Sequence, residues 1–116
     1  NEDGVKQIVA QLNESSYNKL HIVIGMVKDK EIEKVLALLP KDAQYYFTKA
    51  HIPRALPEAD LHAKALPFDL NGETFEDVNA AIASALERAT NDDLILVCGS
   101  VFLVGEVDVE AIGNRQ

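Results

Sequence analysis

Two apolar runs without alternation constrain the fold of this chain more than any other feature. KLHIVIGMV, at residues 19–27, is rich in β-branched residues, and DDLILVC, at residues 92–98, ends in five consecutive apolar positions. Runs of this kind are typical of strands that are buried on both faces, as in a parallel sheet covered by helices. Parallel strands need long crossover connections, so the runs predict helices between them.

Four other segments have the periodicity of amphipathic helices. In the first, Val5, Ile8, Val9 and Leu12 recur at helical spacing, with Asn1 or Asp3 available as a cap. In the last, Thr74 and Asp77 suggest a cap before an apolar stripe. The four predicted helices cover residues 1–12, 29–40, 58–65 and 72–90.

Two shorter segments complete the predicted alternation of strands and helices. AQYYFT at 43–48 is expected to be a strand, followed by a loop at 49–56. LPFDLN at 66–71 is expected to be a short strand, and Pro67 would confine it to a sheet edge or a strand start. The alternation predicts a single α/β domain with a Rossmann-like, doubly wound, mostly parallel sheet. The chain opens in a helical pattern without a methionine, which suggests a domain truncated at its N-terminus.

Composition narrows the functional classes. The chain has 116 residues, enough for one domain, and a net charge of −8, which argues against a nucleic-acid surface. Cys98 is the only cysteine, so no internal disulfide forms, and a reducing compartment is expected. No apolar run approaches the roughly 20 residues of a membrane span. We therefore expect a soluble cytoplasmic domain with neither nucleic-acid nor membrane partners.

Polar residues at the ends of the predicted strands are the candidates for ligand binding, because open parallel sheets bind ligands there. Lys28, Asp29 and Lys30 follow the first strand, and a lysine there suits a carboxylate ligand. Arg54 could clamp a carboxylate or phosphate. Ser100 follows Gly99 at a predicted turn into a helix, where backbone N–H groups could receive an anion. The structural alternatives are a solvated cap, a surface arginine and a simple N-cap.

Several kinds of catalytic site have no support in the sequence. The chain has no G-x-x-x-x-G-K-[ST] phosphate loop and no G-x-G-x-x-G fingerprint. His21, His51 and His62 are scattered without metal-site spacing. Cys98 is expected to be a buried strand residue instead of a nucleophile. From the residues alone, this is an α/β domain that faces a ligand without a complete active site of its own.

Three segments together resemble the C-terminal domain of folylpolyglutamate synthase/dihydrofolate synthase, a relative of the Mur ligases. They are LHIVIGMVKDKEIEKVLALLP, YYFTKAHIPRALP and CGSVFLVGEV, in which G-M-x-x-D-K and C-G-S-x-x-x-V-G-E are the more specific patterns. The opening NEDGVKQIVAQL resembles the continuation of that family's Asp-x-x-His-Asn stretch, with Asn1 in the place of the asparagine. The aspartate and histidine of that stretch are not in this chain. The resemblance covers nearly the whole chain in order.

The resemblance implies an ATP-dependent amide ligase that uses Mg²⁺. ATP phosphorylates a carboxylate of dihydropteroate or a folate, and the amine of glutamate attacks the acyl phosphate. Residues 1–116 would be the C-terminal lid domain, inactive alone and with no catalytic residue or metal ligand, while the ATPase domain of the same polypeptide lies outside it. The implied glutamate-binding residues are Lys28, Lys30, Arg54 and Ser100, and the implied ATP-facing residues are Asn1, Asp29 and Thr48.

Two other functions stay open at this stage. One is a stand-alone α/β module that binds an anion or regulates a partner without catalysis. The other is the lid domain of a ligase acting on peptidoglycan precursors. The sequence leaves undecided whether the parent enzyme has one activity or two, which folate it prefers, how the domains are oriented, and the oligomeric state.

Overall fold

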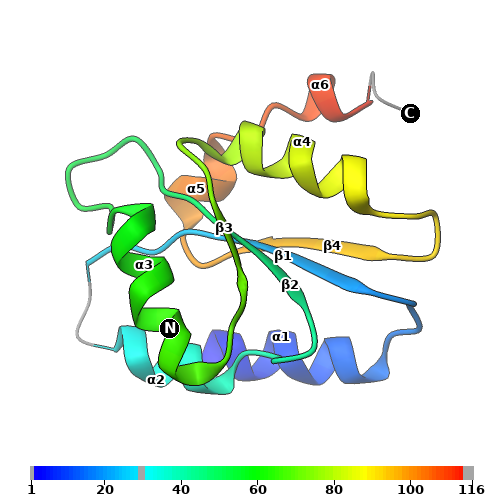
Figure 1. Ribbon diagram of the computed structural model, residues 1–116, viewed down its shortest axis with the longest axis horizontal. Helices are drawn as coiled ribbons and strands as arrows, with labels where there is room; N and C mark the ends of the chain where they lie inside the picture. Colours follow the sequence, from blue (N-terminus) through cyan, green and yellow to red (C-terminus); the bar gives the residue numbers. More distant parts are fainter. Residues whose placement is uncertain (1, 29–30, 114–116) are drawn as a thin grey trace.

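Four parallel strands form the centre of the molecule, in the order β3-β2-β1-β4 (Figure 1). The computed structural model describes residues 2–28 and 31–113. The strands are β1 (Leu20–Ile24), β2 (Gln44–Phe47), β3 (Gly72–Thr74) and β4 (Leu94–Cys98). The parallel sheet and the doubly wound α/β class predicted from the sequence are confirmed.

The central strand β1 explains the first apolar run. It pairs with β2 on one side and with β4 on the other, and all five of its residues are buried. In β4 only Cys98 is buried, because this strand has β1 as its one neighbour in the described sheet. Outside the four strands, Val27 and Ala55 form an isolated antiparallel bridge.

Helices cover both faces of the sheet (Figure 1). One face carries α1 (Glu2–Glu14), α2 (Ile32–Leu38) and α3 (Glu58–Ala65), and the other carries α4 (Val78–Arg88), α5 (Val101–Gly105) and α6 (Val109–Gly113). The side chains of each strand alternate between two hydrophobic cores. In β2, Tyr45 and Phe47 pack toward the α1–α2–α3 layer, whereas Tyr46 packs toward α4 and α5.

The segment between α3 and α4 differs from the sequence prediction. Residues 66–71 do not form the expected strand, because Leu66–Phe68 continue α3 as a 3₁₀ turn that ends at Asp69 with a φ of 60°. The edge strand is β3, which lies within the span predicted as the last helix. That helix, α4, begins at Val78, and its cap is the carboxylate of Asp77, which accepts a 2.8 Å hydrogen bond from the Ala80 N–H.

Two further details follow from the structure. The short helix α6 was not anticipated from the sequence. Among the described residues, none of the helices has both the length and the apolar character that a membrane span requires.

Candidate functional site

The ends of three strands meet at one edge of the sheet, called here the carboxyl edge. β1, β2 and β4 end at Ile24, Phe47 and Cys98, and each is followed by a loop or turn. The Thr48 N–H donates to the Ile24 carbonyl at 2.9 Å, and the Gly25 N–H donates to the Cys98 carbonyl at 3.4 Å. These bonds hold the three strand ends together where an open α/β sheet binds its ligands.

Two glycines allow this close approach. A Cβ on Gly25 would lie 2.9 Å from the Thr48 carbonyl oxygen. Gly99 has a φ of 107°, and a Cβ on it would collide with the Gly25 carbonyl oxygen. This positive φ favours glycine, so Gly99 makes the sharp turn from β4 into α5, as the sequence predicted.

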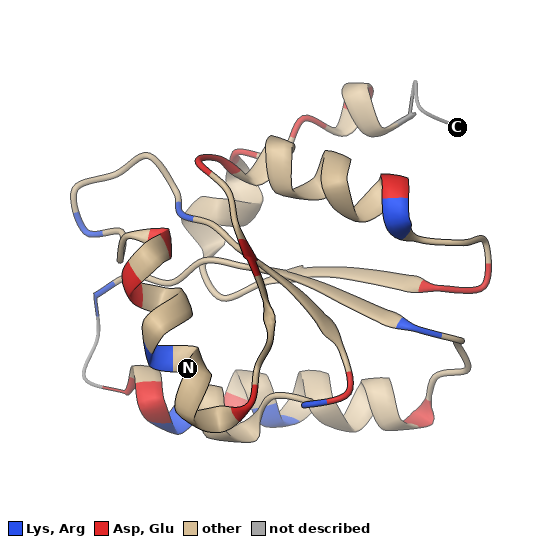
Figure 2. Ribbon diagram, viewed as in Figure 1, with Lys and Arg blue, Asp and Glu red and all other residues tan. Residues whose placement is uncertain are grey.

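The loops after β1 and β2 are joined to each other. The Lys28 N–H donates to the Arg54 carbonyl at 2.8 Å, and the Leu56 N–H donates to the Met26 carbonyl at the same distance, on either side of the Val27↔Ala55 bridge. Lys28 and Arg54 are both exposed and form no ion pair within the described part of the chain. Figure 2 shows basic positions in these two loops at one end of the molecule.

Ser100 is the N-cap of α5, which is the structural alternative that the sequence analysis gave for this residue. Its Oγ accepts a 3.1 Å hydrogen bond from the Phe102 N–H. The helix that follows has five residues, so its aligned peptide dipoles are few. Ser100 therefore fixes the direction in which the chain leaves β4.

A groove of about 550 Å³ opens at the carboxyl edge. Its walls are mostly apolar, and Arg54 and Ser100 both lie in its lining, so two of the predicted site residues share one groove. We call it the edge groove, and it is lined by Gly4, Val5, Ile8, Ile24, Met26, Val27, Val35, Leu39, Arg54, Val97, Cys98, Gly99, Ser100, Val101, Phe102 and Val104.

Two more of the predicted site residues, Lys28 and Thr48, are described and lie outside the lining of the edge groove. The backbone N–H of Lys28 is hydrogen-bonded to the carbonyl of Arg54, but Lys28 does not line the edge groove. Thr48 is fully buried, and its Oγ1 has no hydrogen-bond partner among the described residues. Asn1, Asp29 and Lys30 lie outside the described residues. The roles assigned to these residues stay predictions.

Cys98 lies at the end of β4 and is 9% exposed. Burial raises the pKa of its thiol to about 12. A thiol with such a pKa is protonated at neutral pH and is a poor nucleophile. This is the buried strand residue that the sequence indicated.

A polar network that the sequence reasoning missed occupies the opposite edge, called here the amino edge. The Asp93 carboxylate, 1% exposed, lies 3.0 Å from His21 Nε2 and accepts hydrogen bonds from the N–H groups of Lys19 and Thr90 and from the Thr90 hydroxyl. The His21 hydrogen bond, followed by those from Thr90 and Lys19, holds the pKa of Asp93 well below its usual value. A histidine inside an otherwise apolar strand was the one signal of this network.

The network continues across the sheet through Tyr46. The Tyr46 hydroxyl lies 2.8 Å from His21 Nδ1. Burial raises the pKa of the Tyr46 hydroxyl. The Arg88 guanidinium lies 5.7 Å from the centre of the Tyr46 ring and pairs with Glu73 at 2.8 Å. Residues on β1, β2, β3 and α4 are thereby linked to the start of β4.

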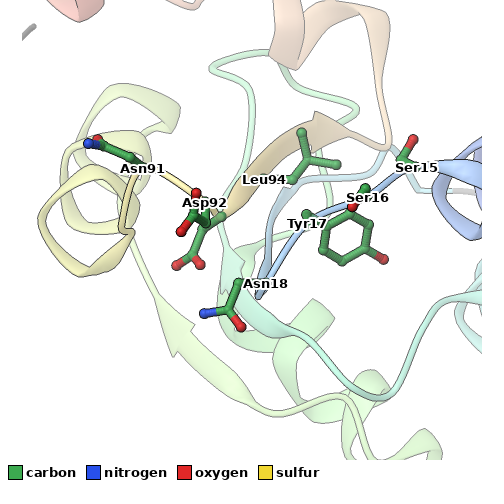
Figure 3. Close-up of a pocket in the computed structure, with 8 residues that line it drawn as sticks. Ser15, Ser16, Tyr17, Asn18, Asn91, Asp92 and Leu94 are labelled. Atoms are coloured by element: carbon green, nitrogen blue, oxygen red, sulfur yellow. The ribbon is translucent and has the colours of Figure 1, made fainter.

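A second pocket, of about 450 Å³, adjoins this network. Figure 3 shows Asn91 and Asp92 from the loop before β4 and Ser16, Tyr17 and Asn18 from the segment after α1. The Asn18 N–H donates to the Asp92 carbonyl at 2.8 Å, which ties the two segments together. In the described part of the chain, no group of three His, Cys, Asp or Glu residues is placed to hold a metal ion.

Comparison with known proteins points to one family. The family model for the Mur ligase glutamate ligase domain matches residues 1–101. A probable bifunctional folylpolyglutamate synthase/dihydropteroate synthase of Haloferax volcanii is 36% identical over 110 residues, which are 91% of this chain and 13% of the relative. The dihydrofolate synthase/folylpolyglutamate synthase of Escherichia coli is 33% identical over 94 residues, which are 81% of this chain and 21% of the relative.

Solved structures give the same result. The structure of Escherichia coli FolC in complex with DHPP and ADP superposes with a TM-score of 0.85 at 28% identity, over 99% of this chain and 27% of that one. A bifunctional folylpolyglutamate synthase/dihydrofolate synthase with Mn, AMPPNP and L-glutamate bound gives a TM-score of 0.82 at 27% identity, over 98% of this chain and 27% of that one. The chain thus spans a quarter or less of the curated relatives' length, and it belongs to the Mur ligase family as a glutamate ligase domain.

Proposed function

We propose that this chain is the C-terminal domain of an ATP-dependent ligase that joins glutamate to dihydropteroate or a folate. The observation that carries the proposal is the carboxyl edge, where Arg54 and Ser100 line one groove on a fold shared along 99% of the chain with FolC. FolC relatives have been solved with ADP, with DHPP and with L-glutamate. Those ligands support glutamate and a folate precursor as the substrates here.

The charges at the carboxyl edge favour an anionic amino acid. The chain carries a net charge of −8, yet Lys28 and Arg54 are held side by side there with no acidic partner in the described residues. Glutamate presents two carboxylates, and a guanidinium can clamp one of them through two hydrogen bonds. We assign Lys28, Lys30, Arg54 and Ser100 to glutamate.

We assign ATP and its divalent ion mainly to an ATPase domain in the same polypeptide. This chain has no phosphate loop, and its described residues include no cluster that would hold a metal ion. Asn1 and Asp29 keep their proposed place facing the nucleotide. Thr48 keeps its proposed place on the nucleotide-facing side, where it is fully buried directly after β2.

The proposed division between two domains suits the chemistry of an acyl phosphate. Such an intermediate hydrolyses readily, and a site that closes between domains excludes water from it. This chain would then supply glutamate-binding residues on closure and would have no ligase activity alone. A cytoplasmic location goes with this proposal, since the single cysteine has no disulfide partner.

A ligation assay tests the proposal directly. The whole polypeptide and residues 1–116 alone are each given ATP, Mg²⁺, glutamate and either dihydropteroate or a tetrahydrofolate. We expect product from the whole polypeptide only, and the acceptor used identifies the activity. No glutamate-dependent ATP consumption by the whole polypeptide with either acceptor would contradict the proposal.

A further inference from the structure

Glu106 is the last residue of the C-G-S-x-x-x-V-G-E pattern, but it does not line the edge groove. It is the C-cap of α5, and Ser100 is the N-cap of the same helix. The Glu106 N–H donates to the Leu103 carbonyl at 3.0 Å, and the side chain of Leu103 is fully buried. Ser100 and Glu106 therefore flank a single five-residue helix that is anchored in the core.

The carboxylate of Glu106 reaches the loop that follows β2. Its Oε2 accepts a 2.7 Å hydrogen bond from the backbone N–H of His51, which lies 55 positions earlier in the chain. Hydrogen bonds to an ionised carboxylate are stronger than those between neutral groups. His51 Nε2 also lies 3.1 Å from the Glu76 carbonyl oxygen, just before α4. His51 therefore connects its loop to the end of α5 and to the segment before α4.

The backbone that carries the Glu106 carboxylate is itself tied to α4. Asn79, in the first turn of α4, donates from Nδ2 to the Glu106 carbonyl at 3.0 Å. The Oδ1 of the same side chain accepts a 2.8 Å hydrogen bond from the Asp108 N–H. One amide side chain thus holds the segment after α5 at two points. The Glu106 carboxylate is therefore a fixed acceptor for the loop at 49–56.

Arg54 lies three residues after His51 in this loop, between two attachments. The Ala55 N–H donates to the Ile52 carbonyl at 3.1 Å, which closes the turn that carries Arg54. The Lys28 N–H donates to the Arg54 carbonyl, so the far side of the turn is fixed against the loop after β1. The near side is fixed through His51 to the end of α5. The second attachment relates the Arg54 turn to the helix that begins after the other groove residue, Ser100.

We propose that Glu106 is a positioning residue, whose carboxylate holds the loop at 49–56 against the end of α5 and so keeps Arg54 in the same groove as Ser100. The inference rests on the proposed function, which gives Arg54 and Ser100 to glutamate. A loop that is already held loses less freedom when its ligand binds. The partner of Glu106 is a backbone N–H, so the loop needs its acceptor oxygen and not its negative charge.

Residue-resolved amide hydrogen exchange on the whole polypeptide tests the contact without use of activity. We expect Glu106→Ala to speed exchange of the His51 and Ala55 amides about tenfold, because the loop is released from α5. Glu106→Gln keeps an acceptor oxygen and should speed it at most about threefold. Asp108→Ala is the matched control, since it removes a carboxylate from the same segment, and that carboxylate accepts from the Ala111 N–H in α6.

Steady-state kinetics on the same variants tests the consequence for glutamate. We expect Glu106→Ala to raise the KM for glutamate about fivefold, with a change of less than about twofold in the KM for ATP. Glu106→Gln should stay within about twofold of the wild type for both substrates. In an Arg54→Ala background, Glu106→Ala should add less than about twofold, because its effect on glutamate passes through Arg54.

Three results would overturn the proposal. The first is unchanged exchange of the His51 and Ala55 amides in Glu106→Ala. The second is an equal rise in the glutamate KM for Glu106→Gln and Glu106→Ala, which would show that the charge itself is needed. The third is a full additional effect of Glu106→Ala in the Arg54→Ala background. A wild-type polypeptide that makes no product contradicts the proposed function instead, and the exchange measurement still decides whether Glu106 holds the loop.

Discussion

At the scale of single residues, the Asp93 carboxylate is the most completely bonded charged group described. It accepts hydrogen bonds from Lys19, His21 and Thr90, and it is excluded from solvent. A buried carboxylate is tolerated only when its bonds are made, so these donors and Asp93 depend on one another. The network stabilises the junction between the starts of β1 and β4.

We expect Asp93→Asn to lower the free energy of unfolding clearly. The neutral amide accepts weaker hydrogen bonds, and one of its oxygens is replaced by a donor that faces other donors. Urea denaturation of the variant measures the effect. Asp92→Asn is the matched control, because Asp92 is exposed and its bond to Asn18 uses the backbone carbonyl. An equal loss in both variants would count against the network.

The same carboxylate predicts an acid-dependent loss of stability. The pKa of Asp93 is lowered in the folded chain relative to the unfolded value of about 3.9, so its contribution is fully present above that value. The contribution is lost as the pH falls below it, when the unfolded chain binds the proton first. The unfolding free energy between pH 7 and 3 should fall less in Asp93→Asn than in the wild type. Parallel pH curves for the two proteins would refute this.

Gly99 gives a second prediction at this scale. Alanine there meets both a φ of 107° and the Gly25 carbonyl, so Gly99→Ala should cost about 2 kcal/mol or more. Gly105→Ala is the control, since a Cβ there meets nothing within 4 Å. Thermal unfolding of both variants measures the difference. A cost for Gly99→Ala as small as that of the control would contradict the conformational argument.

Residue-scale prediction from the sequence succeeded where a local rule applied. Gly99 and Ser100 follow from turn and cap chemistry, and the structure confirms both. The His21–Asp93 pair was not predicted, because 72 residues separate its members and no local pattern links them. Arg54 was found as a candidate, but its place beside Lys28 depends on the folding of two separate loops.

At the scale of elements, apolar patterning identified the strands and helices with large buried faces. It failed between α3 and α4, where β3 has only three residues, two of them exposed. β3 is held by backbone pairing with β2, and Gly72 allows the chain to pass close to the Tyr45 backbone. Neither cause leaves an apolar pattern in the sequence.

The short helix α5 is predicted to depend on one side chain. Leu103 is fully buried and lies near Gly25, so Leu103→Ala should cost about 2–5 kcal/mol in unfolding free energy. Val104→Ala, one position along, removes a half-exposed side chain and should cost much less. Chemical denaturation distinguishes the two. Similar costs would mean that α5 is not anchored through Leu103.

At the scale of the whole molecule, the two edges of the sheet differ in character. The amino edge has the Asp93–His21–Tyr46 network beside a pocket lined mainly by polar loop residues, whereas the carboxyl edge has a mostly apolar groove and exposed cations. The buried hydrogen-bonded network and the exposed cations therefore lie at opposite ends of the strands. This separation would allow the ligand site proposed for the carboxyl edge to bind without loss of the core.

We expect Arg54→Ala and Ser100→Ala in the whole polypeptide to raise the KM for glutamate about tenfold, as loss of one charge-assisted contact would. The KM for ATP should change much less. Steady-state kinetics with each substrate varied gives both constants. Lys41→Ala is the control, because Lys41 is exposed and pairs only loosely, at 3.9 Å, with Asp69. Unchanged glutamate kinetics in both site variants would remove these residues from the glutamate site.

The bridge between Val27 and Ala55 joins the two loops that carry Lys28 and Arg54. With hydrogen bonds on either side of it, neither loop can shift without drawing the other along. The spacing of the Lys28 and Arg54 backbones is therefore set when the chain folds, not when a ligand arrives. The backbone part of the entropy of ordering Lys28 and Arg54 is therefore lost on folding, and a dicarboxylic acid bound there as proposed would cost mainly the rotamer freedom of the two exposed side chains.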